Sequence, residues 1–105
     1  MDRTIAVRNA TDYANAVLKM FHPYRIVMYG SHANGTQRQD SDIDVAVIFN
    51  GYHGNWLEDS AALWLLTQNI SLDIEPILLD STQDKSGFAE MIMQTGQILY
   101  SDEKP

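Results

Sequence analysis

Hydrophobic residues recur along the chain at two spacings, about 3.6 residues and two residues, which are typical of helices and strands with one buried face. Helices are expected from Asn9 or Thr11 to about 21, over 57–68 and over 87–95. Strands are expected over 25–29, 41–49 and 72–79, with a short extended tail at 98–100. The pattern therefore predicts helices and strands that alternate along the chain.

The segments between these elements are polar and rich in turn-forming residues. Residues 50–55 are expected to form a loop, and residues 80–86 a polar, mobile connection. This order predicts an α/β (α+β) fold with a mixed β-sheet, helices packed mainly on one face, and the other face free for a site. A chain of 105 residues is expected to form one domain, 1–105.

The strand expected at 41–49 begins with two carboxylates. Alternation along a strand sends Asp42 and Asp44 to one face, and Ile43 and Val45 to the other. The α carbons of the two aspartates are roughly 6.5 Å apart, and two like charges about 4 Å apart repel by on the order of 4 kcal/mol at an effective dielectric constant near 20. Either protonation of one aspartate or a bound divalent cation would remove this cost. Ligands that are all oxygen favour magnesium or manganese over zinc.

A glycine and a serine follow the strand expected at 25–29. Gly30 lies where the backbone must turn sharply or let another group approach closely. Ser31 can begin a turn of helix over 31–34, whose free backbone N–H groups suit an anion such as a phosphate. The sequence thus places a phosphate-sized loop ten residues before a pair of carboxylates.

Two further carboxylates, Asp73 and Glu75, lie on the strand expected at 72–79. They have the same parity, so the alternation of side chains does not choose between them as a third acidic ligand. Pro76 cannot donate a hydrogen bond to a neighbouring strand, which indicates a location on an edge strand or at a strand end.

Composition narrows the range of partners. The net charge is −7 and the few Lys and Arg residues are scattered, so we expect no long nucleic acid as substrate. The chain has no cysteine, which excludes disulfides and thiolate metal sites, and its sequence contains no membrane-span or signal-peptide pattern, so a cytoplasmic location is expected. Trp56 and Trp64 are interpreted as core or interface packing rather than as a platform for bases.

The motif resembles that of the minimal nucleotidyltransferases of the polymerase-beta-like superfamily. Residues 29–35 read Tyr-Gly-Ser-His-Ala-Asn-Gly and residues 40–45 read Asp-Ser-Asp-Ile-Asp-Val, and the resemblance extends over nearly the whole chain. Members whose third strand reads Ile-Glu-Pro favour Glu75 over Asp73. The resemblance implies that Asp42, Asp44 and Glu75 are the catalytic and metal-binding residues, and that Gly30 and Ser31 bind nucleotide. Many members carry Arg where this chain has His32 and Asn34.

The same resemblance implies a function. It predicts two Mg²⁺ ions, or Mn²⁺, and transfer of a nucleotide, AMP from ATP, to a hydroxyl acceptor supplied by a partner chain or by a homodimer. Stand-alone members are similar to antitoxins that modify a tyrosine of a HEPN-domain toxin, which predicts such a toxin as partner. The alternative is a non-catalytic acidic module that neutralises its partner by binding alone.

Overall fold

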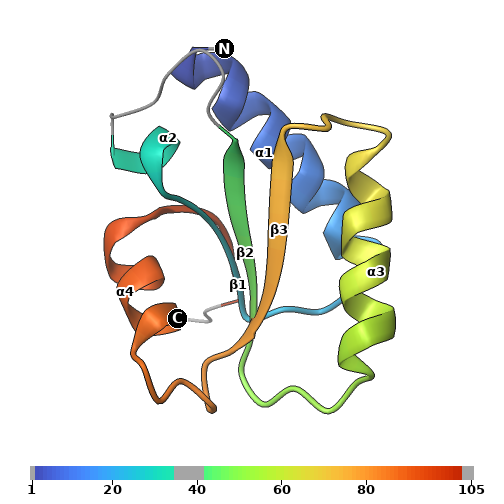
Figure 1. The fold of residues 1–105 in the computed structure, drawn as a ribbon, viewed down its shortest axis with the longest axis vertical. Helices are drawn as coiled ribbons and strands as arrows, with labels where there is room; N and C mark the ends of the chain where they lie inside the picture. The colour runs from blue at the N-terminus through green and yellow to red at the C-terminus, as the bar shows by residue number, and fades with distance from the viewer. Residues whose placement is uncertain (1, 35–41, 103–105) are drawn as a thin grey trace.

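The computed structural model describes residues 2–34 and 42–102, which form one sheet with helices on both of its faces (Figure 1). The predicted α/β fold class is confirmed. The elements in chain order are α1 (Arg3–Leu18), β1 (Arg25–Tyr29), α2 (Ser31–Asn34), β2 (Ile43–Phe49), α3 (Trp56–Thr67), β3 (Ile74–Asp80), α4 (Phe88–Thr95) and β4 (Gln97–Ser101). Within the described ranges, no helix is both long and apolar enough to cross a membrane.

The four strands are ordered β3-β2-β1-β4 and form a mixed sheet. β1 pairs antiparallel with β2 and β4, whereas β2 and β3 are parallel and joined through α3, since parallel neighbours need a crossover connection. β3 is an edge strand, as Pro76 indicated. The tail expected at 98–100 is the other edge strand, β4.

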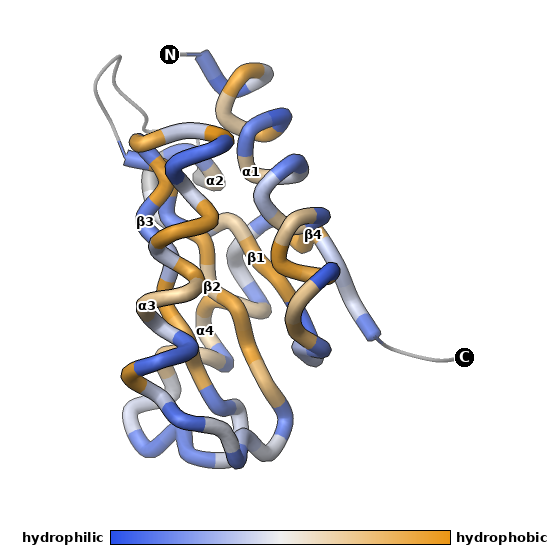
Figure 2. The backbone as a smooth tube through the Cα atoms, turned by 90° about the vertical axis from the view of Figure 1, so that its right-hand side faces the viewer, coloured by the Kyte–Doolittle hydropathy of each residue, from blue (hydrophilic) through white to orange (hydrophobic). Residues whose placement is uncertain are grey.

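Each face of the sheet has its own hydrophobic layer. α1 and α3 cover one face, where Val17 and Leu63 pack against Ile26, Ile43 and Val45. α4 covers part of the other face, where Ile92 packs against Val27, Ala46 and Ile48. Figure 2 shows hydrophobic stretches running through the central strands between these helices. The second face is therefore only partly free, and the site is confined to the end that α4 leaves open.

Helix α1 begins earlier than the sequence pattern suggested. Asp2 caps it by accepting a hydrogen bond from the N–H of Ile5 at 2.9 Å, and Ala6 and Ala10 are buried in its first turns. Alanines bury little surface and give a weak periodic signal, so the pattern became visible only from Tyr13 onward.

Residues 80–86, expected to be mobile, form turns held by two carboxylates. Asp80 accepts hydrogen bonds from the N–H groups of Gly51, Tyr52 and Thr82 at 2.9–3.0 Å. Asp84 accepts from the N–H groups of Ala89 and Glu90 at the start of α4. These bonds fix the connection from β3 to α4.

Candidate active site

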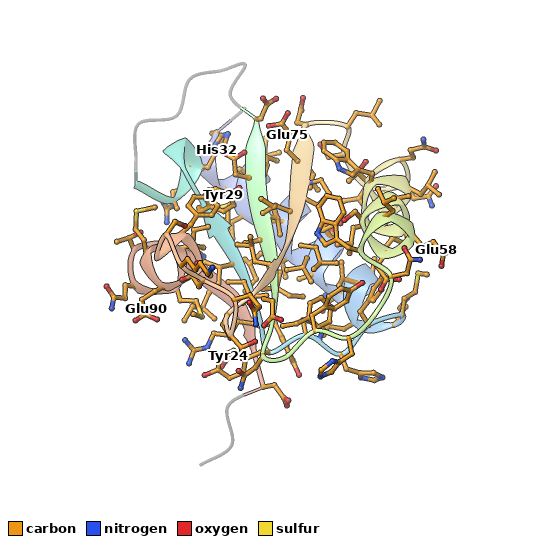
Figure 3. The ribbon with its side chains drawn as sticks, turned by 60° about the horizontal axis from the view of Figure 1, so that its bottom comes forward. Tyr24, Tyr29, His32, Glu58, Glu75 and Glu90 are labelled. Carbon is orange, nitrogen blue, oxygen red and sulfur yellow. The ribbon has the colours of Figure 1, made fainter. Side chains whose placement is uncertain are left out.

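The candidate site lies at the end of the sheet where β1 ends and β2 and β3 begin. In the sheet register, Asp44 on β2 is opposite Tyr29 on β1 and opposite Glu75 on β3. Residues directly opposite each other on neighbouring strands point to the same face, and neighbouring strands are about 4.8 Å apart. Figure 3 shows Tyr29, His32 and Glu75 gathered at this end of the sheet. The side chains of Asp44 and Glu75 are therefore neighbours across two parallel strands.

Asp42 belongs to the same group of acidic side chains. It lies one residue before β2, on the same parity as Asp44, and it interacts with the carboxyl group of Glu75. Asp73 also precedes its strand, and its backbone oxygen accepts a hydrogen bond from the N–H of Ile43 at 2.8 Å. The structure thus brings Asp42, Asp44 and Glu75 together, while the Asp73 side chain is exposed and is not among the charges that act on Asp44 or Glu75.

The electrostatics of this group reflect charges of the same sign. Burial, followed by the negative charge of Asp42, raises the pKa of Asp44 above its usual value, and the positive charge of His32 opposes this rise. Partial desolvation and then the charges of Asp42 and Asp44 raise the pKa of Glu75. Burial also raises the pKa of Tyr29, with smaller effects from Asp44 and Glu75. Each carboxylate makes ionisation of the next one less favourable.

Gly30 brings the backbone close to these carboxylates. Its φ of +79° lies in the left-handed region that glycine adopts readily. A Cβ added at this position would lie 2.5 Å from Oδ2 of Asp44, well inside van der Waals contact. Glycine is therefore required here both for the backbone conformation and for the space occupied by Asp44.

The short helix α2 follows Gly30. Its first residue is Ser31, whose side chain lies outside the part of the chain that the structure describes, as do Gly35, Asp40 and Ser41 of the motif. The backbone N–H of Ala33 donates to the oxygen of Gly30 at 3.1 Å, which closes the turn. The predicted turn of helix after Gly30 is therefore present, and the predicted binding role of Ser31 stays a prediction.

Two residues that the sequence interpretation did not assign contribute to the site. His32 is fully buried, and its charge acts on Asp44. Arg3 donates from Nη1 to the backbone oxygens of His32 and Ala33, at 2.7 and 3.1 Å, and from Nη2 to Oε1 of Gln97 at 2.8 Å. Arg3 thereby ties α2 to both α1 and β4. No local pattern could have revealed it, because its partners are 29 to 94 residues away in sequence.

The donor set fits a hard divalent cation. Asp42, Asp44 and Glu75 offer only carboxylate oxygens, the ligands that magnesium and manganese prefer. Desolvation is the largest cause of the raised pKa values of Asp44 and Glu75, and repulsion between the carboxylates, which a cation would relieve, adds to it. Among residues 2–34 and 42–102, no three His, Asp or Glu side chains are already arranged around one point as a metal site. Ion binding would therefore require these carboxylates to rotate toward a common centre.

Comparisons with known proteins agree with this geometry. The family model described as "Polymerase beta, Nucleotidyltransferase" matches residues 14–105. None of the curated proteins matches the sequence.

Several solved structures share the fold. A protein of Sulfolobus solfataricus assigned to the nucleotidyltransferases superposes with a TM-score of 0.70 and 21% identity, covering 97% of this chain and 86% of that one. A toxin-antitoxin crystallised with AMP-PNP has a TM-score of 0.61 and 24% identity, and a mutant of the MntA-HpeT toxin-antitoxin has 0.60 and 22%; each match covers 89% of this chain and 74% of the other. With the carboxylates in register beside Gly30, and a family model that matches most of its length, the chain belongs to the polymerase beta nucleotidyltransferase family and is a nucleotidyltransferase.

Proposed function

We propose that this chain transfers AMP from ATP to a hydroxyl group of a partner protein, a tyrosine of a HEPN-domain toxin, and so acts as an antitoxin. The observation that carries the catalytic part is the register of Asp44 opposite Glu75, with Asp42 beside them and Gly30 closing against Asp44. Nucleotidyltransferases of this family generally use divalent metal ions. The proposal takes residues 1–105 as a single domain acting in the cytoplasm.

In this proposal each group has a separate task. Asp42 and Asp44 would hold two magnesium ions, Glu75 would be a ligand to one of them, and the Gly30–Ser31 turn would bind the β and γ phosphates. Bound magnesium supplies positive charge that neutralises the triphosphate and stabilises the leaving pyrophosphate. The acceptor oxygen forms a bond to the α phosphorus, the bond from that phosphorus to the bridging oxygen of the β phosphate breaks, and the acceptor proton passes to Glu75.

The choice of partner rests on the fold relatives. Two structures that share this fold are toxin-antitoxin proteins, one of them with the ATP analogue AMP-PNP. In the described part of the chain the elements form one layered sheet without a second lobe to hold an acceptor. The toxin-antitoxin relatives are the reason for proposing that the acceptor lies on another polypeptide.

The decisive experiment is to incubate the purified chain with the HEPN-domain protein encoded next to it, magnesium and ATP. The mass of the HEPN protein is then measured by intact mass spectrometry. A gain of one or more AMP units, absent without magnesium, is the expected result. A partner whose mass does not change under any of these conditions would refute AMP transfer.

A matched pair of variants tests the third carboxylate. Glu75→Gln is expected to abolish transfer because it removes a ligand, whereas Asp73→Asn is expected to leave transfer largely intact because Asp73 is not among the charges that act on Asp44 or Glu75. The opposite result would move the role to Asp73.

The non-catalytic alternative makes a different prediction for the same partner. A binding module would neutralise the toxin equally well after Asp42→Asn or Asp44→Asn. An enzyme would lose neutralisation with either change, although partner binding itself could survive.

A further inference from the structure

The outer face of α3 exposes more large apolar side chains than a solvent-facing helix ordinarily does. Trp56, Leu57, Trp64 and Leu65 are 55%, 74%, 48% and 61% exposed, and Leu72, just beyond the helix, is 79% exposed. Ala61, on the same helix, is also exposed. The inner face is buried through Leu63 and Thr67. We call the exposed residues Trp56, Leu57, Ala61, Trp64, Leu65 and Leu72 the α3 surface.

The α3 surface is hollowed on either side of Trp64. One hollow of about 270 Å³ lies between α3 and the edge strand β3 and is lined by Trp56, Leu63, Trp64 and Pro76 among others. A second, of about 460 Å³, is lined by Ala61, Trp64, Leu65 and Leu72 among others. Two apolar hollows with an indole between them suit side chains that project from successive turns of one helix. Figure 2 shows the hydrophobic segments of α3 at the edge of the molecule.

The charged residues of the segment that contains the α3 surface have one sign. From residue 50 to residue 84 the chain has no Lys or Arg, and it has six acidic residues, of which Glu58 and Asp73 flank the α3 surface directly. The Glu58 side chain points away from the body of the molecule in Figure 3. An occupant with basic residues beside its apolar side chains would match this rim.

The exposed area is large enough to anchor a protein partner. With about 200 Å² for each large side chain, five of them exposed by half to four-fifths present roughly 600 Å² of mainly apolar surface. A standard protein interface buries about 800 Å² on each partner, with an apolar centre and a polar rim. The α3 surface has the area and composition of such a centre.

We propose that the α3 surface is a docking site for an amphipathic helix of a partner protein, with apolar residues in the two hollows and Lys or Arg along its flanks. The inference takes from the proposed function the existence of a partner protein, but it does not require nucleotidyl transfer. A second copy of this chain is a poorer occupant, because it would bring another net charge of −7 and the same acidic rim. A membrane surface is disfavoured for the same reason, since anionic lipids attract basic rims.

Both tryptophans of the chain belong to the α3 surface, so their fluorescence reports on it without a label. The test adds to the full chain a synthetic helical peptide that has leucines at spacings of three and four residues and lysines at its other positions. Binding is expected to shift the tryptophan emission to shorter wavelength, with a dissociation constant on the order of 10 µM. The matched peptide with glutamates in place of the lysines is expected to bind at least about tenfold more weakly.

Two variants test the apolar and the charged contributions to peptide binding separately. Leu65→Gln and Glu58→Gln, both at exposed positions, are each expected to weaken peptide binding several-fold to about tenfold. Met91→Lys on α4, 51% exposed, is the control and is expected to bind as the unchanged chain does. Asp44→Asn is also expected to bind normally, so a failure of nucleotidyl transfer and a failure of this inference give different results.

Three results would overturn the inference. The first is equal binding of the lysine and glutamate peptides, or no emission shift with either. The second is an emission shift with phospholipid vesicles, zwitterionic or anionic, in place of the peptide. The third is a concentration-dependent dimer in sedimentation that Leu65→Gln abolishes, which would make a second copy of the chain the occupant.

Discussion

Strand β3 has an acidic residue near each end, and the two are in opposite electrostatic states. Asp80 accepts hydrogen bonds from the N–H groups of Tyr52, Gly51 and Thr82 and from the Thr82 hydroxyl, which hold its pKa well below the usual range. Glu75, at the other end, faces Asp42 and Asp44, and its pKa is raised. The fold thus supplies hydrogen-bond donors to Asp80, whereas Glu75 faces further negative charges.

This difference separates a structural carboxylate from a functional one. A carboxylate that receives several hydrogen bonds stabilises the folded state as it is. A group of carboxylates with raised pKa values costs stability until a ligand of opposite charge arrives, which is typical of functional sites. We therefore expect a ligand at the Glu75 end of β3, and four changes in the chain test this comparison.

The largest effect is expected at Gly30, which lies beside the carboxylates of the site. Gly30→Ala should lower the free energy of unfolding by about 2 kcal/mol or more, because alanine is strained at φ +79° and its Cβ meets Asp44. Displacement of Asp44 should reduce transfer about 100-fold. Urea unfolding and the AMP-transfer assay measure the two effects.

Gly51→Ala is the matched control for Gly30→Ala. Gly51 has φ +94°, but a Cβ there would have no atom within 4 Å. Only the backbone strain remains, so we expect a loss of roughly 1 kcal/mol and unchanged transfer. Similar activity losses in the two variants would contradict the distinction between the two ends of the sheet.

The next effect concerns Asp80. Asp80→Asn should lower the free energy of unfolding at pH 7 by about 1–2 kcal/mol, because an amide cannot satisfy the same set of donors. A depressed pKa gives stability that is present above the ordinary value of 3.8 and is lost as the pH falls below it toward the folded-state pKa. The difference in the free energy of unfolding between the unchanged chain and Asp80→Asn should therefore be smaller at pH 3 than at pH 7, as measured by urea unfolding. An equal difference in the free energy of unfolding at pH 3 and pH 7 would show that the charge of Asp80 does not cause the loss of stability in Asp80→Asn.

The smallest change in stability is expected at Asp44, and it has the opposite sign. The raised pKa of Asp44 means that its charged form is disfavoured in the folded chain, a cost that is absent at low pH and appears as the pH rises. Without divalent ions, Asp44→Asn should therefore raise the free energy of unfolding at pH 7 by roughly 0.5–1 kcal/mol, after allowance for solvent screening. This increase in the free energy of unfolding should become smaller as the pH approaches 4.

The response to magnesium also distinguishes the unchanged chain from Asp44→Asn. Magnesium should raise the melting temperature of the unchanged chain, measured in magnesium chloride and in EDTA, and have little effect on Asp44→Asn. An equal magnesium shift in both proteins would place the ion elsewhere.

The elements of the sheet could be predicted because they depend on local patterns. Strand alternation placed Asp42 and Asp44 on one face, and Pro76 correctly indicated an edge strand. The early start of α1 was missed because Ala6 and Ala10 give little signal. The buried side of α3 could not be predicted, because apolar residues occur all around that helix and periodicity alone cannot identify the side that faces the sheet.

Only those candidate site residues could be predicted that lie on strands whose alternation of polar and apolar residues is visible in the sequence. Asp44 and Glu75 were found from spacing and resemblance, but their pairing depends on a parallel register that no local window contains. Arg3 was missed for the same reason, since its three acceptors lie on α2 and β4. Interactions between distant segments, rather than local propensity, decide which side chains complete the site.

The bridge made by Arg3 also has a consequence for synthesis on the ribosome. Its acceptors on α2 are translated more than 60 residues before Gln97. A nascent chain would thus contain Gly30 and every carboxylate of the site before β4 emerges from the exit tunnel. The hydrogen bond from Arg3 to Gln97, which joins α2 to β4 through Arg3, would form only after β4 has emerged.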